Sequence, residues 1–218
     1  IATFPNEGEA LGVLAQVAGH TALMRRERTT WPTLPTVAVP QGAQGFLNEA
    51  DSLALLARHG VPTVPMHLCR SAQEARDAFD AVGAPAVAKA CSAEVPHKTE
   101  HGLVALGVAT RDDAGALYER FDAKMTAMGV ARDGVIVAAT RKGRHEFMVG
   151  ARVDPVFGPV VVVGDGGKNV EALKDCAVLL PPFSQDEVVQ ALRTLRIAPL
   201  LDGVRGDPPL DVRALADI

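Results

Sequence analysis

Four consecutive valines at positions 160–163, followed at once by a glycine-rich segment, constrain the fold of this chain more than any other stretch. β-branched side chains favour an extended backbone, so the run predicts a buried β-strand. Gly164, Gly166 and Gly167 come directly after it. Because glycine has no side chain, backbone amides at such a turn can approach a bound group closely, and that group is often a phosphate. An ordinary loop turn explains the same pattern.

A second segment agrees with phosphate handling. Lys89 is predicted on a short strand of small residues, where an ammonium group needs an anionic partner. His97, Lys98 and Thr99 follow in the next loop. Neutral histidine is a nitrogen nucleophile towards phosphorus near pH 7, and a neighbouring lysine stabilises the charge of a phosphate in transfer. The structural alternatives are a lysine that snorkels from an edge strand and a histidine that is merely solvated.

Two common phosphate motifs are absent. The P-loop requires serine or threonine where Asn169 follows Lys168, and the dinucleotide fingerprint requires glycine at Asn169. The run at residues 97–101 does fit the His-x-x-Glu-His pattern of zinc peptidases. Zinc binding would need both histidines on one helix, but Pro96 and Gly102 confine the segment to about six residues, short for a stable helix. A zinc peptidase is thus an alternative that a metal assay tests.

Composition narrows the class of protein. The chain has 218 residues, of which 48% are hydrophobic, enough for one large domain or two small lobes. Its net charge of −4 lacks the basic footprint of a nucleic-acid binder. No apolar run reaches the roughly 18–20 residues that span a bilayer. The three cysteines form no Cys-x-x-Cys pattern, which favours a reducing, cytoplasmic location.

The order of elements predicts a mixed α/β (α+β) fold. Helices are expected after the cap residues Asn48, Ser71, Thr110 and Ser184, and a further helix is expected near the N-terminus, over residues 8–24. Strands are expected between these helices. Residues 1–46 read as a preceding segment that ends in a proline-rich linker, and the first residue, Ile1, indicates a piece of a longer protein. The predicted lobes are residues 47–130 and 131–218.

Five segments carry a family resemblance. They are Pro-His-Lys-Thr-Glu at 96–100, Asp-Pro-Val-Phe-Gly-Pro at 154–159, Gly-Asp-Gly-Gly at 164–167, Glu-Ala-Leu-Lys-Asp at 171–175 and Gly-Val-Arg-Gly-Asp-Pro-Pro at 203–209. In this order they resemble the ATP-grasp domain of NDP-forming acyl-CoA synthetases, such as ADP-forming acetate–CoA ligase, within the succinyl-CoA synthetase superfamily. The resemblance covers about residues 46–218, and residues 1–46 resemble the tail of the preceding CoA-ligase domain with its linker. It implies an ATP-grasp fold with the nucleotide between two lobes.

The resemblance also implies site residues. Lys89 matches a lysine on the ATP phosphates, and His97 matches the catalytic histidine that accepts the γ-phosphoryl group. The loop that carries His97, residues 91–102 and here called the histidine loop, would pass this group to a CoA-ligase module. That module, of the same polypeptide or of a partner subunit, would also bind CoA and a small carboxylic acid. ATP and Mg2+ are the implied cofactors. The remaining nucleotide-binding positions are Lys98, Thr99, Val137, Ala138, Ala139, Glu146, Gly164, Gly166 and Gly167.

Several positions depart from the family pattern. Leu103 stands where a second glycine is common, Ala138 where glutamine is frequent, and His145 where arginine is frequent. The family's Asp-x-Asn-Pro strand, which helps to hold magnesium, has no counterpart before Ile218. These departures leave open an alternative function, a nucleotide-sensing or degenerate ATP-grasp regulatory domain of a protein acyltransferase.

Overall fold

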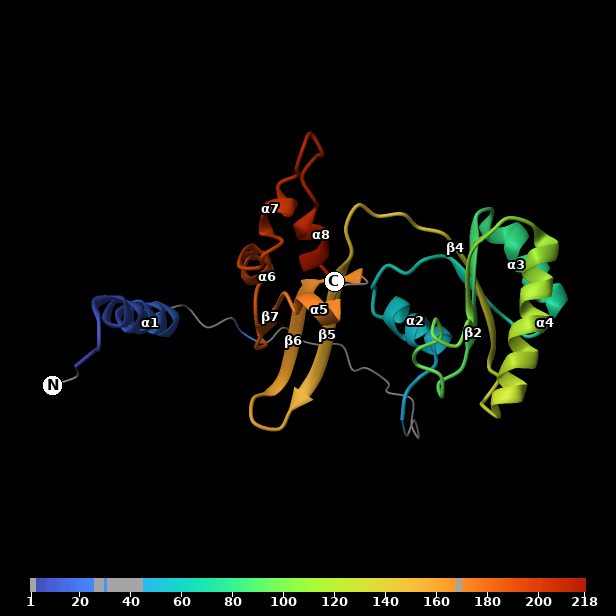
Figure 1. The fold of residues 1–218 in the computed structure, drawn as a ribbon, viewed down its shortest axis with the longest axis horizontal. Helices are drawn as coiled ribbons and strands as arrows, with labels where there is room; N and C mark the ends of the chain where they lie inside the picture. Colours follow the sequence, from blue (N-terminus) through green and yellow to red (C-terminus); the bar gives the residue numbers. More distant parts are fainter. Residues whose placement is uncertain (1–2, 26–29, 31–44, 168–169) are drawn as a thin grey trace. The chain divides into compact units, whose positions relative to one another are not determined.

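The computed structural model describes residues 3–25, 30, 45–167 and 170–218 (Figure 1). Two compact units make up the chain: one comprises residues 37–146 and the other contains residues 147–217. Most of the predicted linker, together with Lys168 and Asn169 of the glycine-rich segment, lies outside the described residues.

The N-terminal helix α1 (Glu7–Arg25) forms where the apolar pattern predicts it. It buries none of its residues, and Leu11, Leu14 and Val17 are all exposed. Neither α1 nor any other helix in the described part of the chain is long and apolar enough to cross a membrane.

A four-stranded antiparallel sheet forms the centre of the unit of residues 37–146. The strand order is β1-β4-β2-β3, so β2 and β4 lie inside the sheet and β1 and β3 form its edges. The strands are β1 (Met66–Cys69), β2 (Ala86–Cys91), β3 (Val104–Val108) and β4 (Gly134–Ala139).

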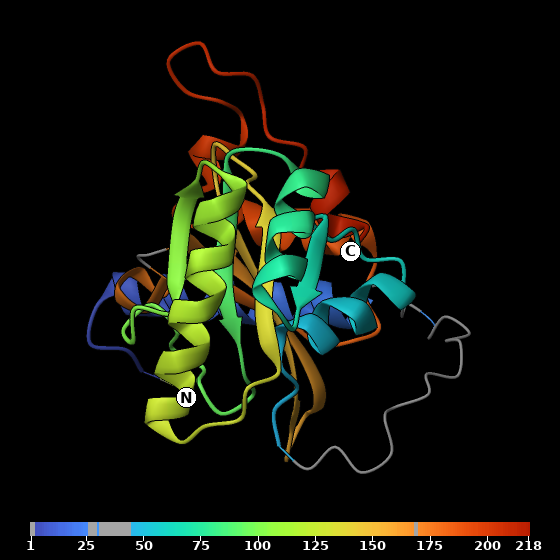
Figure 2. The ribbon, with the colours of Figure 1, turned by 90° about the vertical axis from the view of Figure 1, so that its right-hand side faces the viewer.

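Helices α3 (Ala72–Val82) and α4 (Arg111–Met128) cover one face of this sheet and lie side by side in Figure 2. Their Phe79, Phe121 and Met125 pack against the alanines of β2 in the main core of the unit. The alanines are small enough to let the two helices approach the sheet closely.

Helix α2 (Glu49–Arg58) packs on the opposite face of the sheet, as Figure 1 shows. Its Ala50 clusters there with Cys91 of β2 and with Ile136 and Ala138 of β4. Because side chains alternate across a strand, residues of β2 divide between the two faces. Ala88 and Ala90 belong to the α3–α4 core, whereas their neighbours face α2.

The predicted helix starts are confirmed by their caps. The side chains of Asn48, Ser71, Thr110 and Ser184 each accept a hydrogen bond from the backbone N–H three residues later. Ser184 and Glu187 form a reciprocal capping box. After Ser71, by contrast, the Glu74 carboxylate accepts from the N–H of Arg70, at 2.7 Å.

The second unit is built on the antiparallel sheet β5-β6-β7. The valine run lies in its middle strand, where Val160 and Val163 are buried and the two valines between them are half-buried. Val188, Leu192 and Leu201 of the following helices pack against Val163. The elements are β5 (Phe147–Asp154), β6 (Gly158–Asp165), α5 (Val170–Leu173), β7 (Cys176–Leu179), α6 (Gln185–Arg193), α7 (Ala198–Leu201) and α8 (Val212–Ala216).

The mixed α/β class is confirmed, with sheets that are antiparallel throughout the described residues. The sequence did not predict β1, β7 or α7, which have only four residues each. The predicted lobe boundary after residue 130 precedes β4, which pairs with both β1 and β2. Along the chain, the division between the two compact units falls between residues 146 and 147.

Candidate functional site

Strand β2 places Lys89 on the face of the sheet that carries α2. Its neighbours Ala88 and Ala90 are buried against α3 and α4, so the Lys89 side chain extends from the opposite face. Its Nζ lies 2.7 Å from Oε1 of Glu49, in the first turn of α2. Because β2 is an interior strand, the alternative of a lysine that snorkels from a sheet edge is wrong.

Glu49 also contacts the lysine of the histidine loop. Lys98 donates from Nζ to Oε2 of Glu49 at 3.2 Å, and only 15% of the Lys98 side chain is exposed. The structure therefore brings Lys89 and Lys98 together, one on each oxygen of a single carboxylate. Two of the predicted phosphate ligands are neighbours in space, although the anion between them is a side chain of the protein.

The position of Glu49 is held by its neighbours. Asn48 caps α2 through its Oδ1, and its Nδ2 donates to Oδ2 of Asp133 at 3.1 Å, just before β4. Burial raises the pKa of the Glu49 carboxyl, but the hydrogen bonds and charges of Lys89 and Lys98 outweigh this and hold the pKa below its usual value. Glu49 is therefore a charged anchor close to neutral pH.

His97 lies at the surface in a series of turns, not in a helix. The N–H of Glu100 donates to the carbonyl of His97 at 3.2 Å, and that of Gly102 donates to Thr99 at 3.0 Å. The side chain of His97 is 68% exposed, and its Nδ1 lies 3.9 Å from Oε1 of Glu100. Thr99 is exposed. A zinc site is not supported, because no metal-binding cluster occurs among the described residues and the two histidines of the motif share no helix.

Two residues anchor the histidine loop in the core, one within the loop and one directly after it. Val95 and Leu103 are buried in the cluster beneath α3 and α4. Gly102, just before Leu103, has φ of +56°, a conformation that glycine adopts without strain. Cys91, the last residue of β2, begins the loop. Burial raises the pKa of its thiol, so this cysteine is a poor nucleophile.

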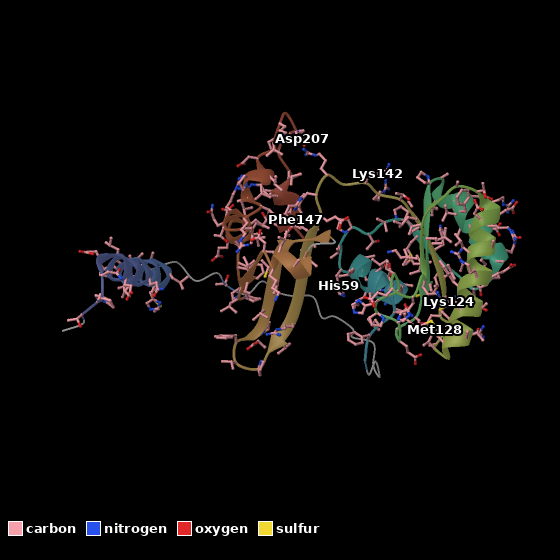
Figure 3. All side chains as sticks on the ribbon, in the orientation of Figure 1. His59, Lys124, Met128, Lys142, Phe147 and Asp207 are labelled. Carbon is pink, nitrogen blue, oxygen red and sulfur yellow. The ribbon has the colours of Figure 1, made fainter. Side chains whose placement is uncertain are left out.

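A third lysine approaches this loop from α4. Lys124, labelled in Figure 3, lies so that its Nζ would be 3.3 Å from a Cβ on Gly102. Sequence reasoning missed both Lys124 and Glu49. An acidic residue in the first helical turn is usually explained by the helix dipole, so no sequence pattern assigns Glu49 to the site.

The residues predicted to line an adenine slot lie on β4. Val137 is buried in the core, and Ala138 faces α2. β4 pairs with β1 on one side and β2 on the other, and Ala139 donates to the carbonyl of Pro65 at 3.0 Å, so the backbone groups there are largely engaged in the sheet. Beyond Ala139, the chain continues without regular structure to Glu146, which is exposed.

The three predicted phosphate-binding glycines belong to the other unit. Gly164 lies inside β6, where an added Cβ would meet the carbonyl oxygen of Asp175 at 2.5 Å. Its lack of a side chain therefore serves the close approach of β6 to the start of β7. Gly166 and Gly167 follow the strand, and Gly167 has φ of +75°. These two remain the candidates for backbone contact with a phosphate.

Comparison with known proteins identifies the family. A family model described as "ATP-grasp domain" matches residues 38–218. Acetate–CoA ligase (ADP-forming) I of Archaeoglobus fulgidus is 35% identical over 78% of this chain and 25% of its own length. The beta subunit of the corresponding Pyrococcus furiosus enzyme is 31% identical, over 79% of this chain and 75% of the subunit. The chain thus spans about a quarter of the first of these relatives.

Solved structures agree. A dinucleotide forming acetyl-coenzyme A synthetase 1 of Ca. Korarchaeum cryptofilum, in complex with coenzyme A, Ca-AMPCP and HgCl+, has a TM-score of 0.75 and 26% identity, covering 81% of this chain and 78% of that one. Another structure of that protein, with coenzyme A and Mg-AMPPCP, has its phosphohistidine segment pointing towards the nucleotide binding site; its TM-score is 0.65 at 25% identity, covering 78% and 73%. The chain belongs to the ATP-grasp domain family and corresponds to the ATP-grasp portion of ADP-forming acyl-CoA ligases.

Proposed function

We propose that this chain binds ATP and uses it to phosphorylate His97, as the nucleotide-binding part of an ADP-forming acyl-CoA synthetase. The observation that carries the proposal is an exposed histidine directly before Lys98, one of two lysines that meet at one carboxylate, within a chain of this family. The Korarchaeum relative, with its phosphohistidine segment and bound ATP analogue, supports the same assignment.

The proposed transfer begins at a ring nitrogen of His97. Nδ1 faces Glu100, so Nε2 is the nitrogen left to attack the γ-phosphorus of ATP. A nitrogen–phosphorus bond forms, the bond from that phosphorus to the bridging oxygen breaks, and ADP leaves with the bonding electrons. The exposed position of His97 leaves room for phosphate oxygens around the ring.

Lys89 and Lys98 supply positive charge for the phosphates. Lys89 extends from a rigid interior strand, which suits a residue that holds the nucleotide. Lys98 adjoins the nucleophile and would neutralise charge on the phosphoryl group in transfer. Thr99, Glu146 and the backbone around Val137, Ala138 and Ala139 complete the proposed nucleotide site on this unit. In the other unit, Gly166 and Gly167 remain candidates for backbone contact with a phosphate, whereas Gly164 serves the packing of β6 against the start of β7.

Mg2+ would accompany ATP and neutralise part of the charge on its phosphates. In the part of the chain that the structure describes, no three Asp, Glu, His or Cys side chains gather into a preformed metal site, and Mg2+ that arrives with ATP takes most of its ligands from phosphate oxygens and water. We therefore assign no magnesium ligand to this chain, and no step above depends on one.

The later steps need groups beyond this chain. A carboxylate oxygen of the acid would take the phosphoryl group from the histidine relay, giving an acyl phosphate. The CoA thiolate would then displace inorganic phosphate from the acyl carbon, giving acyl-CoA. CoA-binding and CoA-ligase modules, in the same polypeptide or a partner subunit, would provide these sites. The relative in Pyrococcus furiosus is itself called a subunit beta, in keeping with such a division.

Phosphorylation by γ-labelled ATP with Mg2+ tests the proposal on the native protein. The wild type should take up label that is stable to base and labile to acid, as a phosphohistidine is. His97→Ala should take up none, whereas His101→Ala, which removes an exposed histidine of the same loop, should label normally. Equal labelling of His97→Ala would overturn the relay. Absence of label from every variant, with ATP still bound, would favour the nucleotide-sensing alternative.

A further inference from the structure

We propose that Glu49 is a positioning residue for phosphoryl transfer, which holds Lys98, and with it the turn that carries His97, beside Lys89. This inference rests on the proposed function. It concerns a residue on α2 that lies 40 positions before Lys89 and 49 before Lys98 in the sequence. Glu49 would act through the two lysines and would not itself touch the reacting atoms.

The contacts of Glu49 make it a fixed point. Each of its carboxylate oxygens accepts from a different lysine, at 2.7 Å from Lys89 and 3.2 Å from Lys98. Its side chain is 25% exposed, so solvent weakens these ion pairs less than it would at an open surface. The cap residue Asn48 ties the start of α2 to Asp133, on the segment that leads into β4.

Without a carboxylate, this arrangement would not hold. Two ammonium groups at one place repel each other, and the nearby wall of the sheet is apolar, formed by Cys91, Ile136 and Ala138. Lys98 would turn towards solvent, because nothing else described in this unit binds its Nζ. The carbonyl of Lys98 would still accept from the N–H of Leu103 at 2.9 Å, so the loop would persist but lose the anchor at its tip.

The charge of Glu49 separates positioning from nucleotide binding. A carboxylate between two lysines opposes the approach of a polyanion such as ATP, so Glu49 cannot be there to raise ATP affinity. Its removal should therefore leave the affinity for ATP similar or higher. The rate of transfer to His97 should fall, because displacement of a reacting group by about 1 Å costs on the order of 100-fold.

The experiment measures single-turnover phosphorylation of the native protein by γ-labelled ATP, together with the Kd of an ATP analogue that is not hydrolysed. Glu49→Gln keeps the size of the side chain and removes its charge. It should slow labelling about 10- to 100-fold and keep the Kd within about threefold of wild type or tighter. Glu49→Asp keeps the charge on a shorter side chain and should give an intermediate rate. Asp51→Asn, which removes an exposed carboxylate from the same helical turn, is the matched control and should label at the wild-type rate.

A double variant tests whether Glu49 acts through Lys98. Glu49→Gln in a Lys98→Met background should cause little further loss, since the partner is already gone. The inference is overturned if wild type labels normally and Glu49→Gln labels equally fast, if Glu49→Gln weakens ATP binding as much as it slows labelling, or if the two losses multiply. Absence of label in the wild type would instead contradict the proposed function itself, so the two failures are distinguishable.

Discussion

The backbone N–H of Ala90 donates a 2.9 Å hydrogen bond to the carbonyl of Leu103, which joins the two ends of the histidine loop at its base. Leu103 is also completely buried. At the position where the family commonly has a second glycine, this chain therefore has a core side chain. The loop is therefore closed at its base by one backbone hydrogen bond and one buried side chain.

Leu103→Ala should destabilise the first unit by about 2–5 kcal/mol, because truncation of a buried leucine leaves a cavity. Denaturant unfolding followed by circular dichroism would measure the loss. Leu106→Ala is the matched control, since Leu106 lies on the following strand with 77% of its surface exposed, and its truncation should change little. Equal losses from the two variants would contradict the burial of Leu103.

Gly164→Ala should destabilise the second unit by about 1–3 kcal/mol, because the new methyl group would overlap the backbone of Asp175. Gly150→Ala, in the neighbouring strand β5 with no atom within 4 Å of the new Cβ, should leave the unfolding midpoint unchanged or slightly higher. A loss of ATP affinity in Gly164→Ala without loss of stability would show that a phosphate, and not strand packing, requires this glycine.

Lys89→Met should weaken ATP binding about 10- to 100-fold, since a charge-assisted hydrogen bond contributes about 1.5–3 kcal/mol. Calorimetric titration with a nonhydrolysable ATP analogue and Mg2+ would measure this. Arg58→Met removes one positive charge from the exposed end of α2 and should bind like the wild type. Unchanged affinity in Lys89→Met would remove Lys89 from the nucleotide site.

The stabilising effect of Glu49 should depend on pH. Its pKa in the folded chain lies below the ordinary 4.5, because Lys89 and Lys98 outweigh the effect of burial. A lowered carboxyl pKa stabilises the folded state above the unfolded value, and this contribution is lost as pH falls through the folded value. The difference in unfolding free energy between wild type and Glu49→Gln should thus be present at about pH 7 and shrink at about pH 3. A difference that grew towards acid pH would have the wrong sign.

Local features of the fold could be predicted from the sequence, and long-range contacts could not. Asn48 and Ser184 predict the starts of their helices, because a cap residue interacts with a backbone N–H only three positions away. The valine run likewise predicts β6. Strands β1 and β7 were missed because Met-His-Leu-Cys and Cys-Ala-Val-Leu are too short to show a period, and pairing with a longer strand makes them extended.

The candidate site shows the same division. Lys89 could be singled out because a lysine in an apolar strand needs an anionic partner, and His97 because it adjoins Lys98 within a motif of the family resemblance. Glu49 could not be singled out, because its two lysine partners lie 40 and 49 positions later and no local sequence pattern predicts these contacts. The sequence suggested one role, phosphate binding, for all three glycines of the glycine-rich segment. Only the structure shows that Gly164 has a different role, because the backbone of Asp175 approaches it closely.

The bridge from α2 to β2 and the histidine loop has a consequence for how the first unit folds. Glu49 leaves the ribosome well before either lysine, and a contact across so long a stretch of chain is costly in loop entropy until the strands between have paired. Accordingly, the three charges should meet after β2 has joined the sheet. We therefore expect the bridge to be among the last contacts made during folding, and competence for phosphorylation to mark completion of the unit.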